Sequence, residues 1–261
     1  TYGFTRPLVF IIDFQYNTKT IKIIYSKSYF KSYFLIAGSF IMLYYMINNW
    51  DSLDLIGLIL VFFAYAMVIL VALPIHEFSH AYVADRMGDQ TARWNGRLTL
   101  NPFAHLDVIG TALIFLIGFG YAKPVPVNPR NFRDYKKGTI LTSFAGPLSN
   151  FILGFLSLLI FRLILFASSS DMFYYFLSLF IVNFAYTNII LAVFNLMPVP
   201  PLDGYRIASS FLPPRWVFFI ERYQWYITIA FFVLVVSDRF GGVLTRIANP
   251  IYNLFFRILG L

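Results

Sequence analysis

The sequence predicts an all-α polytopic membrane protein with about five to six transmembrane helices. Hydrophobic residues make up 59% of the 261 residues and charged residues only 12%, whereas a soluble domain carries about 25% charged residues. Mean hydropathy is +0.70. Five apolar stretches approach or exceed the roughly 20 residues that cross a bilayer: Tyr33 to Ile47, Leu55 to Ala84, Ile140 to Ala167, Met172 to Met197 and Trp216 to Val236.

Three further segments have less certain patterns. Val108 to Ala122 and Val243 to Leu259 are apolar but short or interrupted, so each could span, re-enter or lie at the interface. Leu8 to Tyr25 alternates only roughly between apolar and polar residues, which allows a β-hairpin there.

The charge distribution indicates a lipid partner. The net charge is +8, but the basic residues lie beside apolar spans and do not form the aromatic-interleaved stripes of a nucleic-acid interface. We therefore expect a lipid bilayer and no nucleic acid as partners. The chain has no Cys, so a metal site would have to use His and carboxylate ligands.

Loop charges predict the orientation. Several lysines precede the first span, while the loop "NNWDSLD" after it has neither Lys nor Arg, so the N-terminus is expected in the cytoplasm. A full crossing at Val108 to Ala122 would put the next basic cluster outside, so we predict a re-entrant or shallow segment there. The lysines are Lys19, Lys22, Lys27 and Lys31, and the cluster is Lys123, Arg130, Arg133, Lys136 and Lys137.

The stretch "HEFSH" places two of the three histidines four residues apart at the end of a long apolar run. On a helix, His76 and His80 share one face and can reach one zinc ion, while Glu77 is displaced toward a water on that ion. Zinc makes such a water acidic, and Glu77 could accept its proton as general base. Ionisable groups at membrane depth indicate function more often than a polar helix end.

A catalytic zinc needs a third protein ligand and one open position. Asp203 is a candidate, because it follows the span Met172 to Met197 and lies near the cytoplasmic end of an inward-running helix, as His76 does. The prolines of "FNLMPVPPLDG" break that helix, which is tolerated where protein or a watered cavity satisfies the backbone. Asp203 could equally cap an ordinary turn.

The pairing of "HEFSH" with "NLMPVPPLDG" resembles the site-2 protease family of intramembrane zinc metalloproteases, peptidase family M50. "GRLTLNPFAHLDVIGT", "AKPVPVNPRNFRD" and "AGPLSN" add to the resemblance to its compact prokaryotic branch without PDZ or CBS domains. The resemblance implies one Zn²⁺ held by His76, His80 and Asp203, with Glu77 as the catalytic base. It also implies regulated intramembrane proteolysis of substrates with a transmembrane segment, in a prokaryotic cell membrane, with the active site toward the cytoplasm.

The resemblance suggests three regions. Residues 1–54 are an N-terminal segment with the first span, residues 55–206 a metalloprotease core, and residues 207–261 C-terminal transmembrane or interfacial helices. A membrane-associated re-entrant or β segment is expected between the HExxH helix and the next span. Its extended pieces "GRLTL" and "KPVPVN" could accept an unwound substrate by strand addition, or could only tie the segment together.

Other polar residues keep two interpretations. Asn195 could bind substrate or stabilise an oxyanion, or could make an interhelical hydrogen bond. Asn150 has the same two roles open, with packing favoured, and His105 is expected to be structural. A metal-ion transporter is the main rival function, but such proteins usually contain internal repeats, and this chain shows none. An inactive scaffold is disfavoured because all four chemical residues are present.

Overall fold

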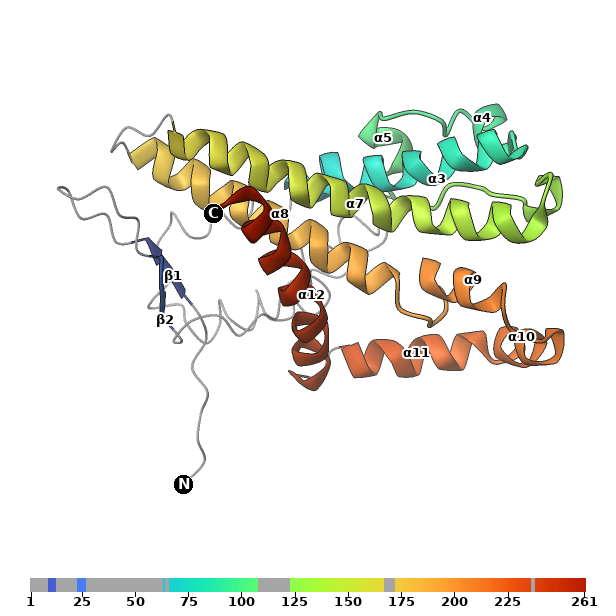
Figure 1. Ribbon diagram of the computed structural model, residues 1–261. Coiled ribbons are helices and arrows are strands. Elements are labelled where there is room, and N and C mark those ends of the chain that lie inside the picture. The colour runs from blue at the N-terminus through green and yellow to red at the C-terminus, as the bar shows by residue number, and fades with distance from the viewer. Residues whose placement is uncertain are drawn as a thin grey trace, which may run out of the picture.

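The computed structural model describes residues 9–12, 23–26, 63, 66–107, 123–166, 172–235 and 238–261 (Figure 1). Two predicted segments lie outside these residues: the span Tyr33 to Ile47 and the re-entrant or shallow segment Val108 to Ala122. Most of the described chain is helical, as predicted. Its elements are β1 (Val9–Ile12), β2 (Ile23–Ser26), the π-helix η1 (Val68–Ala72), α3 (Leu73–Met87), α4 (Thr91–Trp94), α5 (Pro102–His105), the 3₁₀ helix η2 (Pro129–Asn131), α7 (Tyr135–Phe166), α8 (Met172–Asn195), α9 (Asp203–Ser209), α10 (Pro214–Arg222), α11 (Gln224–Val235) and α12 (Asp238–Leu259).

β1 and β2 pair as antiparallel strands, with Val9 opposite Ser26 and Ile12 opposite Ile23. The pairing agrees with the hairpin interpretation of Leu8 to Tyr25. The mainly helical fold therefore carries one strand pair near its N-terminus, beyond what an all-α prediction allows.

Helix α7 is the one single helix of the described part that is long and apolar enough to cross a membrane, over Tyr135–Leu165. At about 1.5 Å per residue, its 32 residues span roughly 48 Å, more than the roughly 30 Å of a hydrocarbon core. The carboxylate of Asp134 caps the first turn by accepting from the backbone N of Lys137 at 3.0 Å. This cap places the helix start five residues before the predicted Ile140, so the first turn extends beyond the apolar run.

Helix α8 runs beside α7 along most of its length (Figure 1). Gly154 of α7 allows the close approach, since a Cβ there would lie 3.0 Å from Cγ1 of Ile189 and 3.1 Å from the carbonyl oxygen of Ala185. Leu158, Ala185 and Ile189 are fully buried between the two helices. Helix α8 ends at Asn195, three residues before the proline that the sequence analysis expected to stop it.

The predicted span Trp216 to Val236 is bent in the structure. Helices α10 and α11 meet at Tyr223 with a bend of 67° and together pass as one broken span by length and composition. Helix α10 has no buried residue. Its Trp216, Phe218 and Phe219 are more than half exposed, a pattern typical of a helix at a membrane interface.

Helix α12 is continuous through Pro250, although its sequence suggested an interrupted segment. Residues spaced by four along it are buried and join the main hydrophobic core with α7 and α8: Leu244, Ala248, Tyr252 and Phe256. The opposite face of α12 is exposed. Helix α12 therefore packs against α7 and α8 through one face only.

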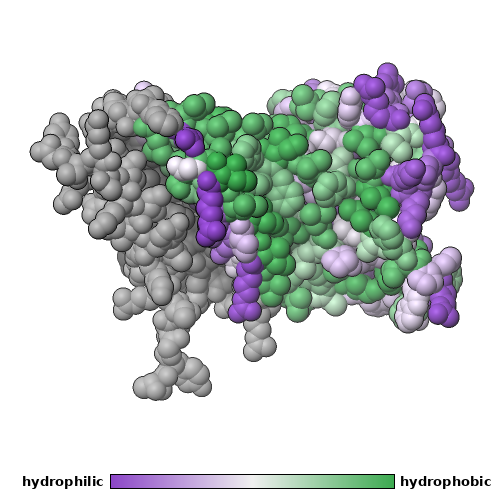
Figure 2. Space-filling model, in the orientation of Figure 1, coloured by the Kyte–Doolittle hydropathy of each residue, from purple (hydrophilic) through white to green (hydrophobic). Residues whose placement is uncertain are grey.

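The surface is divided into an apolar belt and a hydrophilic end. Figure 2 shows green residues across the middle of the described molecule and purple residues gathered at the end where Figure 1 places α4, α10 and the start of α7. The outer face of α7 carries exposed apolar side chains at helical spacing: Leu148, Ile152, Leu156, Ile160 and Leu163. Such a continuous apolar face indicates contact with lipid. With the bent pair counted, up to two membrane-crossing units lie in the described residues.

Replacing Gly154 by Val is expected to destabilise the helix pair, because the new side chain collides with Ile189 and the Ala185 carbonyl. Overpacking of this kind costs about 1–3 kcal/mol. Thermal unfolding in detergent measures it. Gly242→Val is the matched control, since a Cβ at Gly242 of α12 has nothing within 4 Å. Equal melting temperatures for both variants would contradict the packing role of Gly154.

Candidate metal centre

Helix α3 carries both histidines of the HExxH motif on its buried face. Pro74 lies in the first turn of α3, which follows the π-helix η1 directly. His76 is 5% exposed and His80 is 8% exposed, and their ring centroids lie 4.6 Å apart. The helical spacing expected from the sequence therefore brings the two imidazoles together inside the protein.

Asp203 lies at the same site although it is distant in the sequence. It is the first residue of α9. The loop after α8 folds back on itself through backbone hydrogen bonds from Val199 to Met197 and from Leu202 to Val199. A Cβ on Gly204 would collide with the carbonyl of Leu196, so only glycine fits this turn. The tight turn fixes where the neighbouring carboxylate points.

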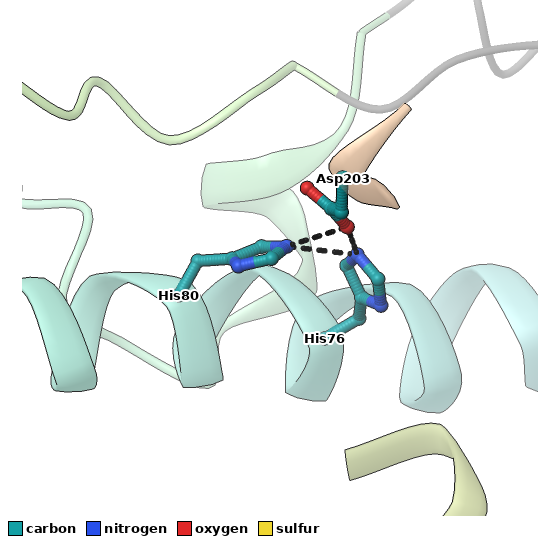
Figure 3. Close-up of side chains that lie close together, drawn as sticks. All are labelled: His76, His80 and Asp203. Carbon is teal, nitrogen blue, oxygen red and sulfur yellow. Dashed lines mark hydrogen bonds and ion pairs between the residues drawn. The ribbon is translucent and has the colours of Figure 1, made fainter. Parts of the chain in front are cut away.

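Three ligand atoms converge at the site (Figure 3). Oδ2 of Asp203 lies 3.3 Å from Nε2 of His76 and 3.1 Å from Nε2 of His80. The two Nε2 atoms are 3.0 Å apart. Neighbouring ligands of a tetrahedral zinc ion with bonds of about 2.0–2.2 Å lie roughly 3.4 Å apart. The cluster therefore matches the size of a zinc ligand set.

The hydrogen bonding of His80 indicates that the cluster requires a cation. Its Nδ1 lies 2.6 Å from the carbonyl oxygen of Thr142, and a carbonyl only accepts, so Nδ1 carries the proton. In the neutral ring Nε2 then presents a lone pair toward the carboxylate of Asp203 and toward His76. Electron-rich atoms this close are stable with a cation between them, and the donor set fits zinc.

Gly146 of α7 gives the cluster its space. A Cβ at this position would collide with Nε2 of His80 and would lie 2.6 Å from Cε1 and Nε2 of His76. The bare Cα thus lets α7 pack directly against the imidazole pair. Any side chain here would displace the histidines or fill the metal position.

Glu77 is partly buried beside this cluster. Its Oε2 accepts a hydrogen bond of 3.0 Å from the backbone N of Val125, which lies in the "KPVPVN" segment. The carboxylate is therefore held by a chain segment 48 residues away. The sequence analysis did not anticipate this contact.

The remaining candidates lie apart from the ligand cluster or on its margin. His105 belongs to no potential ligand group of the described residues, which contain one such group, formed by His76, His80 and Asp203. His105 is fully buried, and its Nε2 lies 2.8 Å from the carbonyl oxygen of Thr99. Asn195, the last residue of α8, donates from Nδ2 to the carbonyl of Leu191 at 3.0 Å. A role for Asn195 in substrate binding stays a prediction.

The two extended-looking segments lie against each other. Leu98 of "GRLTL" and Val127 pack on a buried group of Ala81, Ala92 and Val125. No strand is assigned to residues 96–100 or 123–128, so the β part of the predicted segment is wrong for these residues. Some of their backbone groups contact side chains instead: the N–H of Val125 bonds to Glu77, the N–H of Asn128 bonds to Asp89, and the Thr99 carbonyl oxygen lies 2.8 Å from Nε2 of His105.

Asp89 fixes the polar end of this segment. It is fully buried and accepts hydrogen bonds from the backbone N of Asn128 at 2.7 Å, Nδ2 of Asn131 at 2.8 Å and Oγ1 of Thr91 at 2.5 Å. Burial alone would raise the pKa of this carboxyl, but the hydrogen bonds outweigh it and hold the pKa below its ordinary value. Glu77 and Asp89 thus pin "KPVPVN" to α3, which supports its role as a tie.

Sequence analysis missed the parts played by Gly146, by the Thr142 carbonyl and by Asp89. The motif "AGPLSN" contains Gly146, but its residue types do not show that this glycine contacts the histidines. A carbonyl and a backbone N–H leave no signal in residue types. No sequence pattern marks Asp89 as a buried aspartate.

Comparison with known proteins identifies the family of this chain. The model of peptidase family M50 matches residues 163–236, which include Asp203. "Putative zinc metalloprotease YwhC" of Bacillus subtilis is 41% identical over 186 residues, covering 70% of this chain and 84% of the relative. This chain belongs to the site-2 protease family, peptidase family M50. Zinc is its cofactor, and the family fits the ligand cluster described above.

More distant M50 relatives occur in mycobacteria. "Putative zinc metalloprotease Rip2" of Mycobacterium tuberculosis is 32% identical over 150 residues, and that of Mycolicibacterium smegmatis is 29% identical over 151 residues. Each alignment covers 56% of this chain and 56% of the relative. No solved structure matches this chain.

Replacing His76, His80 or Asp203 by Ala is expected to lower bound zinc strongly, because each removes one of three converging ligand atoms. His105→Ala should keep zinc near one ion per chain, because His105 lies outside the cluster. Metal analysis of the purified variants measures both. Zinc loss in His105→Ala together with retention in Asp203→Ala would show that Asp203 is not the third ligand.

Proposed function

We propose that this chain is an intramembrane zinc metalloprotease that hydrolyses peptide bonds in or near the transmembrane segments of membrane proteins. The observation that carries the proposal is the buried convergence of His76, His80 and Asp203 against α7, the helix long and apolar enough to cross a membrane. A metal centre beside this helix supports a substrate that lies in the bilayer.

The residues have separate roles in this reaction. His76, His80 and Asp203 hold the zinc, and the bound metal supplies a Lewis acid that polarises a carbonyl oxygen and makes water acidic. Glu77 takes a proton from the attacking water and passes it to the leaving amine. The N–H of Val125 holds Oε2 of Glu77, which keeps the carboxylate from rotating freely. Asn195 is proposed to hold the substrate backbone or the developing oxyanion.

The depth of the centre supports a transmembrane substrate. Helix α3 continues for about two turns beyond His80 and ends at Gly88, whose positive φ of 113° closes the helix. At about 1.5 Å per residue, these eight residues place the centre roughly 12 Å from the hydrophilic end. A scissile bond must therefore enter the apolar belt, and the cleavage would belong to regulated intramembrane proteolysis.

Glu77→Gln tests the mechanism. The amide cannot accept a proton, so cleavage of a membrane-protein substrate should fall by about 10²-fold or more, while zinc stays near one per chain because Glu77 provides no ligand atom. Peptide-bond cleavage and zinc content are measured on the same preparation. Substantial turnover in this variant, with contaminating proteases excluded, would remove Glu77 from the mechanism.

We also propose that the active site and the N-terminus face the cytoplasm of a prokaryotic cell. Basic residues at the hydrophilic end support this orientation, including Arg86, Arg93 and Lys136. The relatives described above are bacterial.

The absence of Cys from the chain makes orientation measurable by single-cysteine labelling. Arg130→Cys, at an exposed position of η2, should react with a membrane-impermeant maleimide only in inside-out vesicles. Ser169→Cys, between the ends of α7 and α8 in the sequence, should react only in intact cells. The reverse labelling pattern would overturn the proposed orientation.

A further inference from the structure

The two zinc-binding histidines differ in the hydrogen bonding of their Nδ1 atoms. Nδ1 of His80 has the carbonyl oxygen of Thr142 at 2.6 Å. Nδ1 of His76 is buried and has no hydrogen-bond partner among the described residues. In Figure 3 this atom lies on the side of the ring away from Asp203 and His80. A metal-binding imidazole almost always donates its second N–H to an acceptor, which fixes the ring, so His76 needs one.

Helix α7 presents one line of residues, spaced by four, to α3. Thr142 gives its carbonyl to His80, and Gly146 contacts both imidazoles. Numbers along α3 fall as those along α7 rise, so the two helices are antiparallel here. Asn150 is therefore the next residue of the line, one turn past Gly146 in the direction of the α3 N-terminus.

The lean of the side chains brings Asn150 and His76 toward each other. Helical side chains tilt toward the N-terminus of their own helix. His76 thus leans along α3 toward the level of Asn150, while Asn150 leans along α7 back toward Gly146. Because the helices are antiparallel, the two side chains tilt into the same space.

Asn150 is also unsatisfied. It is 1% exposed, and neither Oδ1 nor Nδ2 has a hydrogen-bond partner among the described residues. An amide buried between helices without a partner is rare, because desolvation is not compensated. Asn150, an amide with no hydrogen-bond partner among the described residues, therefore lies one helical turn along α7 from Gly146, the residue that contacts the His76 ring.

We propose that Asn150 is the positioning residue of His76, with Oδ1 accepting from Nδ1–H directly or through one water. This acceptor holds the ring so that Nε2 faces the metal, as the Thr142 carbonyl does for His80. The inference rests on the zinc site and is independent of the proposed substrate. It assigns Asn150 to the metal centre, where the sequence alone favoured helix packing.

Zinc affinity of the full chain in detergent, measured by competition with a fluorescent chelator, tests the proposal. Asn150→Leu removes the acceptor at similar size and should weaken zinc binding about 10–100-fold, the usual effect of losing such a partner. Asn150→Asp keeps an acceptor and should bind zinc at least as tightly as the unaltered chain. The readout is metal binding, so a failure here leaves the proposed proteolysis standing.

Asn188→Leu is the matched control, because Asn188 is a fully buried asparagine on the neighbouring helix α8 whose Nδ2 bonds the Phe184 carbonyl. It should leave zinc affinity unchanged. Unchanged affinity in Asn150→Leu, or an equal loss in Asn188→Leu, would overturn the proposal in favour of interhelical packing. If Asn150→Leu does not fold, Asn150→Ser, whose hydroxyl is too short to reach, replaces it, and equal affinities of the Ser and Asp variants would overturn it.

Discussion

The structure depends on one electrostatic constraint, which is that two imidazole lone pairs and a carboxylate oxygen are held within 3.3 Å of one another inside the protein. Without a cation these atoms repel, and burial in an apolar surrounding strengthens that repulsion. A zinc ion held by His76, His80 and Asp203 would remove the conflict and would link α3 to α9 across more than 120 residues. Metal binding would then also be a tertiary contact, and the folded arrangement and the loaded site would stabilise each other.

Backbone groups and missing side chains supply most of the support around this cluster. The Thr142 carbonyl fixes His80, the Val125 N–H holds Glu77, and Gly146 and Gly204 leave the space that the histidines and the turn before α9 occupy. These groups are rigid and uncharged, so they orient the ligands without adding a second buried charge, which would be costly in this environment. Asn150 extends the same pattern with a neutral side chain.

The sequence predicted what local periodicity determines. His76 and His80 were placed together because positions four apart share a helix face, and α7 and α8 were found from their apolar length. It did not predict the contact between Glu77 and Val125, because contacts between distant segments that use a backbone N–H or a missing Cβ leave no trace in residue spacing. The bend at Tyr223 does have a signal, since Glu221, Arg222 and Gln224 interrupt the apolar stretch there. Asp203 is recognised from its place after the span Met172 to Met197 and from the resemblance to the site-2 proteases, and not from periodicity.

The polar end of α3 connects the metal centre to the aqueous boundary. Beyond His80 the helix exposes Tyr82 and Arg86 and buries Ala81 and Ala84. Asp89 lies just after the helix and accepts a hydrogen bond from Asn128 of the "KPVPVN" segment, whose Val125 N–H also bonds to Glu77. One short segment therefore connects Glu77 with the hydrophilic boundary at Gly88, roughly 16 Å farther along the helix. Because its N–H groups at Val125 and Asn128 are occupied by carboxylates and two of its residues are prolines, it has few donors left for a substrate strand. The segment is better suited to fixing the position of the Glu77 carboxylate than to unwinding a substrate helix.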